Sequence, residues 1–286
     1  MLCRIAWGHI VKSGCYPDVV WLRTKRGHTG TCYFPKELMA EVSVVVLARN
    51  EEKNIGPCLE TLQWADELLV LDSFSEDATV EIARGMGAEV HQRTFVNYPL
   101  QRNTGLQLAS KEWVFFVDAD ERVTPKLAEE IRRVVDEGGF AGWWVPRKNY
   151  IFGKWVRHAG WFPDHQLRLL RRDKARYDEG REVHELVDLD GEAGYLDSLM
   201  IHYNYDTVQQ FRAKQDLYTD YEARLMFDSG ERARIHNFIL QPVRQFLWRY
   251  VTLQGYKDGW HGLLLSLLMA YYELVRYEKL LRLERG

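Results

Sequence analysis

The stretch that decides the fold is Trp113-Val114-Phe115-Phe116-Val117-Asp118-Ala119-Asp120-Glu121, a run of large apolar residues that ends in three carboxylates. The apolar part predicts a buried strand. Asp118 and Asp120 are two residues apart, so in extended backbone their side chains point the same way. Such a pair at the end of a buried strand is suited to binding a divalent metal through oxygen ligands. The alternative is that one aspartate caps the next helix and the others are solvated.

The residues before this stretch alternate between expected strands and helices. Strands are expected at residues 43–49, 68–71, 88–91 and 113–117, with helices ending near residues 64, 86 and 109. This order predicts an α/β fold with a doubly wound, mostly parallel sheet and helices on both faces. In such sheets ligands bind beyond the carboxyl ends of the strands. Three of these strands end in polar clusters, which we expect in one crevice: Asn50-Glu51-Glu52, Asp72-Ser73 and Asp118-Ala119-Asp120.

The residues after this stretch show a helix, a strand and then a change of pattern. Thr124-Pro125 opens a helix that Gly138-Gly139 closes, and a strand is expected at residues 140–146. Residues 147–205 are rich in Trp, Arg and His and are expected to be irregular. From Thr207 the chain is expected to be helical, with a break at Gln241-Pro242 and a last helix over residues 261–284.

Composition limits the classes of function. The 286 residues carry a net charge of −3, so there is no global electrostatic case for nucleic acid. The four cysteines form no CxxC pair, so neither a zinc site nor a redox motif is indicated. The first thirty residues lack the continuous apolar core of a secretory signal, which makes the cytoplasm the expected compartment. Residues 1–38 show no sustained period and are expected to form an N-terminal extension outside the fold.

Residues 206–286 are expected to form a helical appendage. A membrane span needs about 20 apolar residues, and the uncharged stretch over residues 262–272 is about half that length. Basic residues mixed with Trp and Tyr in this region favour helices that lie at a membrane interface. The alternative is that the helices pack on the main domain or form the seam of a homodimer.

With these strand ends in view, the sequence resembles family 2 glycosyltransferases of the GT-A fold. The resemblance is carried by residues 43–52, 71–79 and 116–121. It is strongest to the branch of lipopolysaccharide core β-glucosyltransferases, which shares the elements Gln101-Arg102-Asn103 and Val183-His184-Glu185. The resemblance covers residues 42–205 well and the helical tail loosely. It implies that residues 39–205 form a catalytic domain that binds a nucleotide sugar.

The resemblance also implies a reaction and a set of residues. The reaction is an inverting transfer of a hexose, most simply glucose, from a UDP-sugar to a saccharide acceptor of lipopolysaccharide core or another lipid-linked glycan, at the cytoplasmic side of the plasma membrane. The cofactor would be Mg²⁺ or Mn²⁺, which prefer hard carboxylate ligands. The implied residues are Asp120 and His202 for the metal, Asp118 for the ribose, Ala48, Asn50 and Glu51 around base and ribose, Asp72 for the uracil and Arg102 for a phosphate.

The catalytic base is expected to be Glu185, with His184 orienting it or the acceptor and Asp164 in reserve. The family often has a Glu-Asp pair here, so His184-Glu185 departs from its pattern. Each assignment has a plainer alternative: Glu185 and Arg102 as ordinary surface residues, and His202 as a structural histidine. The basic run of Arg168, Arg171 and Arg172 is either a contact for an anionic acceptor or a solvated face.

Two other functions fit parts of the sequence. A phosphohydrolase of the haloacid dehalogenase type also uses Asp-x-Asp after a buried strand. That motif usually lies on the first strand and continues to Thr or Val, whereas here it lies on the fourth and Arg122 follows Glu121. The second alternative is a non-catalytic membrane scaffold that binds a nucleotide sugar. The intact carboxylates argue against this alternative, whereas the unusual His184-Glu185 motif favours it.

Overall fold

The computed structural model of the protein describes residues 10–11, 19–23, 29–33, 40–179 and 187–285. The chain divides into two compact units, Met1–Ala40 and Glu41–Gly286. In the first unit three strands pair antiparallel in the order β1-β2-β3. Their bounds are β1 (Ile10–Val11), β2 (Val19–Arg23) and β3 (Thr29–Tyr33). All other described elements belong to the second unit.

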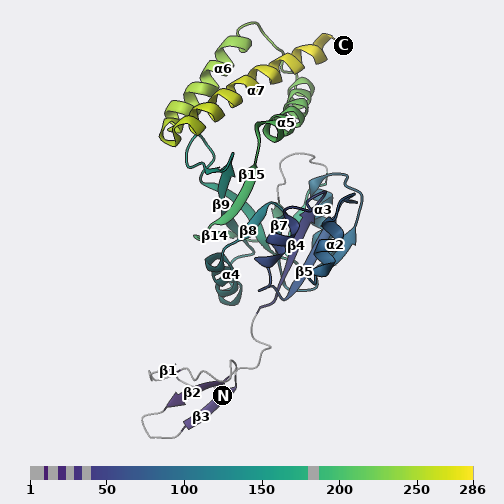
Figure 1. The fold of residues 1–286 in the computed structure, drawn as a ribbon, viewed down its shortest axis with the longest axis vertical. Coiled ribbons are helices and arrows are strands. Elements are labelled where there is room, and N and C mark those ends of the chain that lie inside the picture. The colour runs from purple at the N-terminus through teal and green to yellow at the C-terminus, as the bar shows by residue number, and fades with distance from the viewer. Residues whose placement is uncertain (1–9, 12–18, 24–28, 34–39, 180–186, 286) are drawn as a thin grey trace. The chain divides into compact units, whose positions relative to one another are not determined.

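The second unit is built on one large sheet (Figure 1). Its strand order is β6-β5-β4-β7-β11-β9-β15-β8. The first four strands of this order run parallel: β4 (Val42–Ala48), β5 (Glu67–Asp72), β6 (Glu89–Gln92) and β7 (Trp113–Asp118). They alternate along the chain with α1 (Ile55–Glu60), α2 (Thr79–Gly85) and α3 (Tyr98–Leu108). The predicted α/β order is therefore confirmed, although α1 ends before the expected residue 64.

Helices cover both faces of this parallel half. On one face, Leu106 of α3 packs in a core with Val45 and Phe116. On the other, Phe115 contacts the ring of Trp64, and Arg132 of α4 (Pro125–Glu137) lies over the same ring. Alternate side chains of β7 thus enter the two opposite cores, as the pleat of a strand requires.

Helix α3 lies close to the sheet because residue 105 is glycine. A Cβ atom at Gly105 would lie 2.7 Å from Phe116 Cε1 and 3.0 Å from Val45 Cγ1, which is closer than a packed interior allows. The close approach lets Arg102, one turn earlier in α3, lie 5.0 Å from the centre of the Phe116 ring. A side chain at residue 105 would therefore displace α3 together with Arg102.

The other half of the sheet comes from the region expected to be irregular. It consists of β9 (Gly142–Ile151), β11 (Asp164–Arg171), β15 (Met200–Tyr205) and β8 (Glu121–Val123), with β10 (Lys154–Trp155) and β14 (Ala193–Tyr195) paired to β9. A separate pair is formed by β12 (Ala175–Tyr177) and β13 (Val187–Leu189). The expectation of irregular structure was wrong. Ion-paired side chains are buried on these strands, so the sequence lacks the apolar alternation that indicates a strand.

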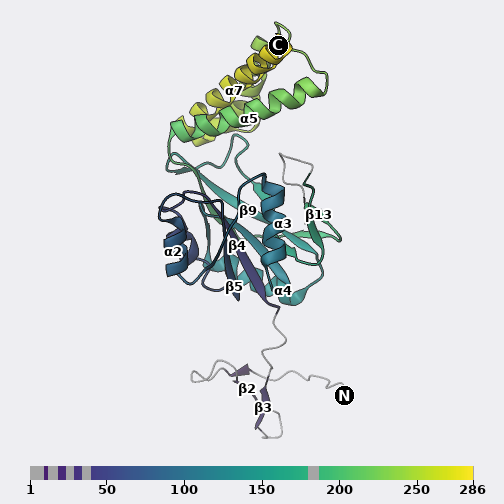
Figure 2. The same cartoon turned by 90° about the vertical axis from the view of Figure 1, so that its right-hand side faces the viewer.

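The C-terminal region is helical, as predicted. Its elements are α5 (Val208–Asp228), α6 (Asn237–Leu247), the π-helical turn η2 (Trp248–Thr252), the 3₁₀ turn η3 (Gly255–Asp258) and α7 (Trp260–Arg285). Helices α5 and α6 both pack on α7, beyond the carboxyl ends of the parallel strands (Figures 1 and 2). The expected break at Pro242 was wrong: α6 continues through it, held by its packing on α7. Among the described helices, none has the length and apolar character needed to cross a membrane.

Candidate active site

The polar ends of three parallel strands lie side by side. Ala48 at the end of β4 is the register partner of Asp72 at the end of β5. On the other side of β4, Leu47 is the partner of Asp118 at the end of β7. Parallel pairing of buried apolar strands therefore brings the residues expected to bind the nucleotide to the same edge as the Asp118-Ala119-Asp120 motif.

The loops after β4 and β5 are tied to each other by hydrogen bonds. Asn50 N donates to Ser75 Oγ at 2.8 Å, and Asn50 Oδ1 accepts from Glu76 N at 2.9 Å. Glu51 N donates to Thr79 Oγ1 at 2.7 Å. Asn50 has a left-handed φ of 54°, a conformation that asparagine tolerates better than most residues. These contacts fix the shape of the segment that the sequence assigns to base and ribose.

Asp72 is fully buried at the end of β5. Its Oδ2 accepts hydrogen bonds from Ser75 N at 2.9 Å and from Gln92 Nε2 at 3.0 Å. The carboxylate therefore supports the turn that carries Ser75. A direct contact of Asp72 with a uracil ring stays a prediction.

Asp118 is held by two buried arginines. Arg102 Nη2 from α3 lies 3.1 Å from Asp118 Oδ1, and Arg168 Nη2 from β11 lies 2.5 Å from Asp118 Oδ2. Arg102 is 1% exposed and Arg168 is 5% exposed. The surface alternative was therefore wrong for both residues. Arg171 is exposed to a greater extent and pairs with Asp173 and Glu112.

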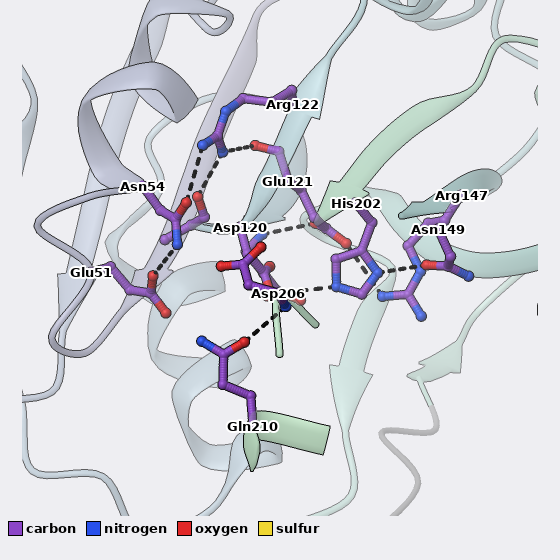
Figure 3. Close-up of polar contacts among 12 residues, drawn as sticks. Glu51, Asn54, Asp120, Glu121, Arg122, Arg147, Asn149, His202, Asp206 and Gln210 are labelled. Atoms are coloured by element: carbon purple, nitrogen blue, oxygen red, sulfur yellow. Dashed lines mark hydrogen bonds and ion pairs between the residues drawn. The ribbon is translucent and has the colours of Figure 1, made fainter. Parts of the chain in front are cut away.

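Asp120 faces a histidine whose other nitrogen is fixed (Figure 3). His202 Nε2 lies 3.4 Å from Asp120 Oδ2, and His202 Nδ1 lies 2.7 Å from Asn149 Oδ1. Asn149 Nδ2 donates to Trp161 O and to Asp164 Oδ2, both at 2.9 Å. Because both of those partners only accept, Asn149 must present its oxygen to the imidazole, and Nδ1 must carry a proton.

This tautomer leaves His202 Nε2 with a lone pair unless the ring is charged. A neutral imidazole that faces a carboxylate across 3.4 Å leaves room for a cation between them, and the hydrogen bond on Nδ1 is the usual support of a metal-ligating histidine. No cluster of three or more His, Cys, Asp or Glu suited to a metal occurs among the described residues. Mg²⁺ is commonly bound through one or two carboxylates together with substrate phosphates and water. Asp120 would supply one such carboxylate, and His202 could add a nitrogen ligand.

The surroundings of Asp120 favour its charged form. Burial alone would raise the pKa of the Asp120 carboxyl. The charges of Lys214 and Arg147 lower it, and so does His202 in the form that carries a proton on both ring nitrogens, with the result that the pKa lies below its usual value. Lys214 comes from α5 and lies 5.3 Å from the centre of the Tyr205 ring. Burial lowers the pKa of Lys214, while neighbours that include Tyr218, Tyr205 and Asp120 raise it by more. A positively charged lysine therefore acts on the Asp120 carboxylate.

Glu121 and Asp164 share Arg147. Glu121 is fully buried; its Oε2 accepts from Asp118 N at 2.8 Å and its Oε1 lies 3.3 Å from Arg147 Nη1. Arg147 Nη2 lies 2.7 Å from Asp164 Oδ2. Burial and the charge of Asp118 raise the pKa of Glu121 well above its usual value. Burial would also raise the pKa of Asp164, but Arg147 and the hydrogen bonds from Asn149 and Gln166 hold it low.

The expected base lies outside the described residues: His184 and Glu185 fall within residues 180–186. On the described side of that segment, Asn103 of α3 holds the chain in place. Asn103 Nδ2 donates to Tyr177 O at 2.9 Å and to Glu179 Oε1 at 2.7 Å, and Asn103 Oδ1 accepts from Tyr177 N at 2.9 Å.

Sequence reasoning missed the supporting residues Arg147, Asn149 and Lys214. Arg147 and Asn149 lie on β9, within the region expected to be irregular. Lys214 lies in an expected helix, where one lysine among polar residues carries no special signal. A polar residue within a buried strand is unusual, so recognising β9 as a strand would have singled out Asn149.

The sequence of the domain matches one known family. Residues 43–200 match the family described as Glycosyl transferase family 2. The chain belongs to this family. The match includes all three strand-end motifs and decides against the phosphohydrolase alternative.

Relatives and solved structures resemble the chain over most of its length. The lipopolysaccharide core biosynthesis glycosyltransferase LpsC of Rhizobium meliloti is 28% identical over 253 residues, which cover 84% of this chain and 91% of LpsC. S. aureus TarS in complex with UDP-GlcNAc is 17% identical, with a TM-score of 0.46 and coverage of 84% and 83%. Glucosyl-3-phosphoglycerate synthase of Mycobacterium tuberculosis, in complex with Mn²⁺, UDP and glucosyl-3-phosphoglycerate, is 21% identical, with a TM-score of 0.45 and coverage of 67% and 81%.

Proposed function

We propose that this family 2 glycosyltransferase transfers a hexose, most simply glucose, from a UDP-sugar to a saccharide acceptor with inversion and with Mg²⁺ or Mn²⁺. The main support for the proposal is that His202 Nε2 faces Asp120 Oδ2 at the edge of the sheet where the parallel strands end. The acceptor class, lipopolysaccharide core or another lipid-linked glycan, is suggested by the similarity to LpsC. Such an acceptor would place the enzyme at the cytoplasmic face of the plasma membrane.

The donor would lie along the strand ends. Ala48, Asn50 and Glu51 would surround base and ribose, and Asp72 would contact the uracil. Asp118 would accept hydrogen bonds from the ribose hydroxyls while Arg102 and Arg168 hold its carboxylate in place. In this role Arg102 positions Asp118, and its contact with a phosphate stays a prediction.

The transfer itself needs charge neutralisation and a base. The acceptor oxygen forms a bond to the anomeric carbon of the sugar, the bond from that carbon to the diphosphate breaks, and UDP leaves with the electron pair. A metal bound by Asp120 and His202 would neutralise charge on the leaving diphosphate. The Lys214 cation near Asp120 would add to the same effect.

The acceptor proton would move to Glu185, with His184 orienting either partner. Asp164 is a poorer candidate for this role. Its carboxylate already accepts from Arg147, Asn149 and Gln166, and its pKa is held low, with Arg147 the largest of the lowering influences. A weakly basic carboxylate abstracts a proton poorly, which supports Glu185.

The test is a panel of UDP-sugars incubated with the full chain and a lipopolysaccharide core saccharide, read as released UDP with Mn²⁺, with Mg²⁺ and with a chelator. We expect release that requires an acceptor, is highest with one hexose donor and stops with chelator. Metal-dependent binding of UDP without turnover of any donor would instead support the non-catalytic scaffold. Full turnover in chelator would contradict the metal assignment.

A further inference from the structure

The outward side of α6 and η2 is apolar. Between residues 239 and 251, the exposed positions are Arg244 and six apolar side chains. The six side chains are 46–65% exposed and belong to Ile239, Leu240, Val243, Leu247, Trp248 and Val251. Their spacing of three and four residues places them on one face of a continuous helix. We call these six residues the α6 face.

The α6 face is not required to hold the helix in the fold. The opposite side of α6 packs inward, where Phe238 contacts the ring of Tyr277 on α7. A helix that covers a core normally turns polar residues to water on its other side. Here the outward side carries large apolar residues instead, and a contiguous patch of this kind marks an interaction surface.

The charge around the α6 face identifies its partner. From Arg232 to Lys257 the sequence holds five Arg or Lys and no Asp or Glu, although the whole chain has a net charge of −3. Arg232, Arg234, Arg244 and Lys257 are exposed, and Trp260, 68% exposed, comes three residues after Lys257, beyond the buried Asp258. An apolar helix face with arginines and tryptophans around it fits the headgroup region of an anionic bilayer. In a twofold dimer, by contrast, the face would meet its own positive charges.

The segment from α6 to η3 is attached to the part of the unit that contains the large sheet. Asp258, just after this segment, accepts hydrogen bonds from Arg157 N at 3.0 Å and His158 N at 2.7 Å. Arg249 Nη1 donates to Ala159 O at 2.7 Å. Both contacts reach the loop between β10 and β11. Docking of the α6 face would therefore orient the catalytic sheet as well, with its carboxyl edge on the side of the helices (Figures 1 and 2).

We propose that α6 and η2 lie in the surface of an anionic membrane, with the α6 face inserted at the boundary between headgroups and acyl chains. The inference goes beyond the glycosyl transfer and does not depend on the identity of donor or acceptor. It explains how a protein whose described helices do not span a membrane would meet an acceptor carried by a lipid.

The test is co-sedimentation of the full chain with vesicles of phosphatidylcholine, with and without phosphatidylglycerol. We expect binding only to the vesicles that contain phosphatidylglycerol, and weaker binding at high salt because surface charges are screened. The double variant Val243→Gln/Leu247→Gln should lose roughly tenfold or more in vesicle affinity, because two partly exposed apolar side chains no longer enter the bilayer. Arg244→Gln should reduce the preference for phosphatidylglycerol.

Leu217→Gln on α5 is the matched control, since Leu217 is 71% exposed but lies outside the α6 face; it should bind vesicles like the parent chain. UDP release with a water-soluble acceptor should be equal in all variants, which separates docking from catalysis. Unchanged vesicle binding of the double variant would overturn the proposal. So would absence of vesicle binding together with a dimer, measured by analytical ultracentrifugation, that the double variant dissociates.

Discussion

His202 Nε2 lies 3.4 Å from Asp120 Oδ2, although the two residues come from β15 and from the turn between β7 and β8. The hydrogen bond between His202 Nδ1 and Asn149 Oδ1 on β9 decides which ring nitrogen faces the carboxylate. Binding of a metal at this point would therefore depend on three separate parts of the sheet and not on the Asp118-Ala119-Asp120 motif alone.

His202→Ala removes one proposed ligand. We expect the Mn²⁺ concentration for half-maximal UDP release to rise by more than the about 10- to 100-fold that loss of an outer-shell partner costs, because Asp120 is then the remaining proposed protein ligand. Asn149→Ala should give a smaller rise by freeing the ring to rotate, and Asp120→Ala should abolish metal-dependent release. His91→Ala on β6, whose ring pairs with the exposed Glu89, serves as control. An unchanged metal requirement in His202→Ala would show that His202 is structural.

The strand ends could be predicted because their signals are local. A continuous apolar run followed by carboxylates, as at Phe116 and Asp118, indicates both the strand and the edge where it ends. The partners of those carboxylates carry no local signal. Arg168 pairs with Asp118 from 50 residues away, and Asn149 orients His202 from 53 residues away. These partners are brought together only by the tertiary fold, which is why the sequence alone did not identify them.

Arg168→Met tests the buried pair at Asp118. The substitution leaves Asp118 with Arg102 but removes the closer of the two arginines, and loss of one partner from a buried pair costs about 3–5 kcal/mol. Asp118 retains partial exposure, so we expect a loss of about 2–3 kcal/mol in the free energy of unfolding. The Michaelis constant for the UDP-sugar should also rise, because Asp118 would be less well positioned. Urea denaturation and initial-rate kinetics measure the two effects.

Arg171→Met on the same strand is the control for that substitution. Arg171 pairs with exposed carboxylates, and exposed pairs contribute about 0–1 kcal/mol. Asp118→Asn/Arg168→Met should be more stable than the sum of the single losses predicts, since the pair is coupled. Additive losses would show that Arg168 acts through packing and not through Asp118.

Asp164→Asn tests the network through stability as a function of pH. Because the folded pKa of Asp164 lies below its usual value, the ionised carboxylate stabilises the fold. This contribution is complete above the unfolded pKa of about 3.9 and is lost as the pH falls through the folded pKa. The variant should be less stable by about 1–3 kcal/mol at neutral pH. Its unfolding free energy should depend less on pH in the acid range.

The measurement is urea unfolding over a series of pH values for the parent, Asp164→Asn and Asp173→Asn. Asp173 is an exposed aspartate on the loop after β11, and its substitution should leave the curve within about 0.5 kcal/mol of the parent. If Asp164→Asn and the parent have parallel curves in acid, then Arg147 does not stabilise the charge of Asp164.

Lys214→Gln tests the cation beside Asp120. Lys214 lies over the ring of Tyr205, and its positive charge lowers the pKa of Asp120. Its charge would help most when the diphosphate departs, so kcat should fall by about tenfold or more, with a smaller change in the Michaelis constant for the donor. Lys126→Gln on the exposed side of α4 is the control. Loss of donor binding with unchanged kcat would place Lys214 in ground-state binding instead.

Glu185→Gln tests the proposed catalytic base. The amide has the size of the Glu185 carboxylate but cannot take up the proton from the hydroxyl group of the acceptor saccharide. UDP-sugar binding should therefore be retained, while the rate of transfer should fall by about 100- to 10,000-fold. Calorimetric titration of UDP with Mn²⁺ measures the first quantity, and UDP release in the presence of acceptor measures the second. Asp164→Asn is the matched comparison and should retain most of the transfer rate, because Asp164 is already engaged with Arg147 and Asn149. Normal transfer by Glu185→Gln together with loss of transfer in Asp164→Asn would reverse the assignment and make Asp164 the base.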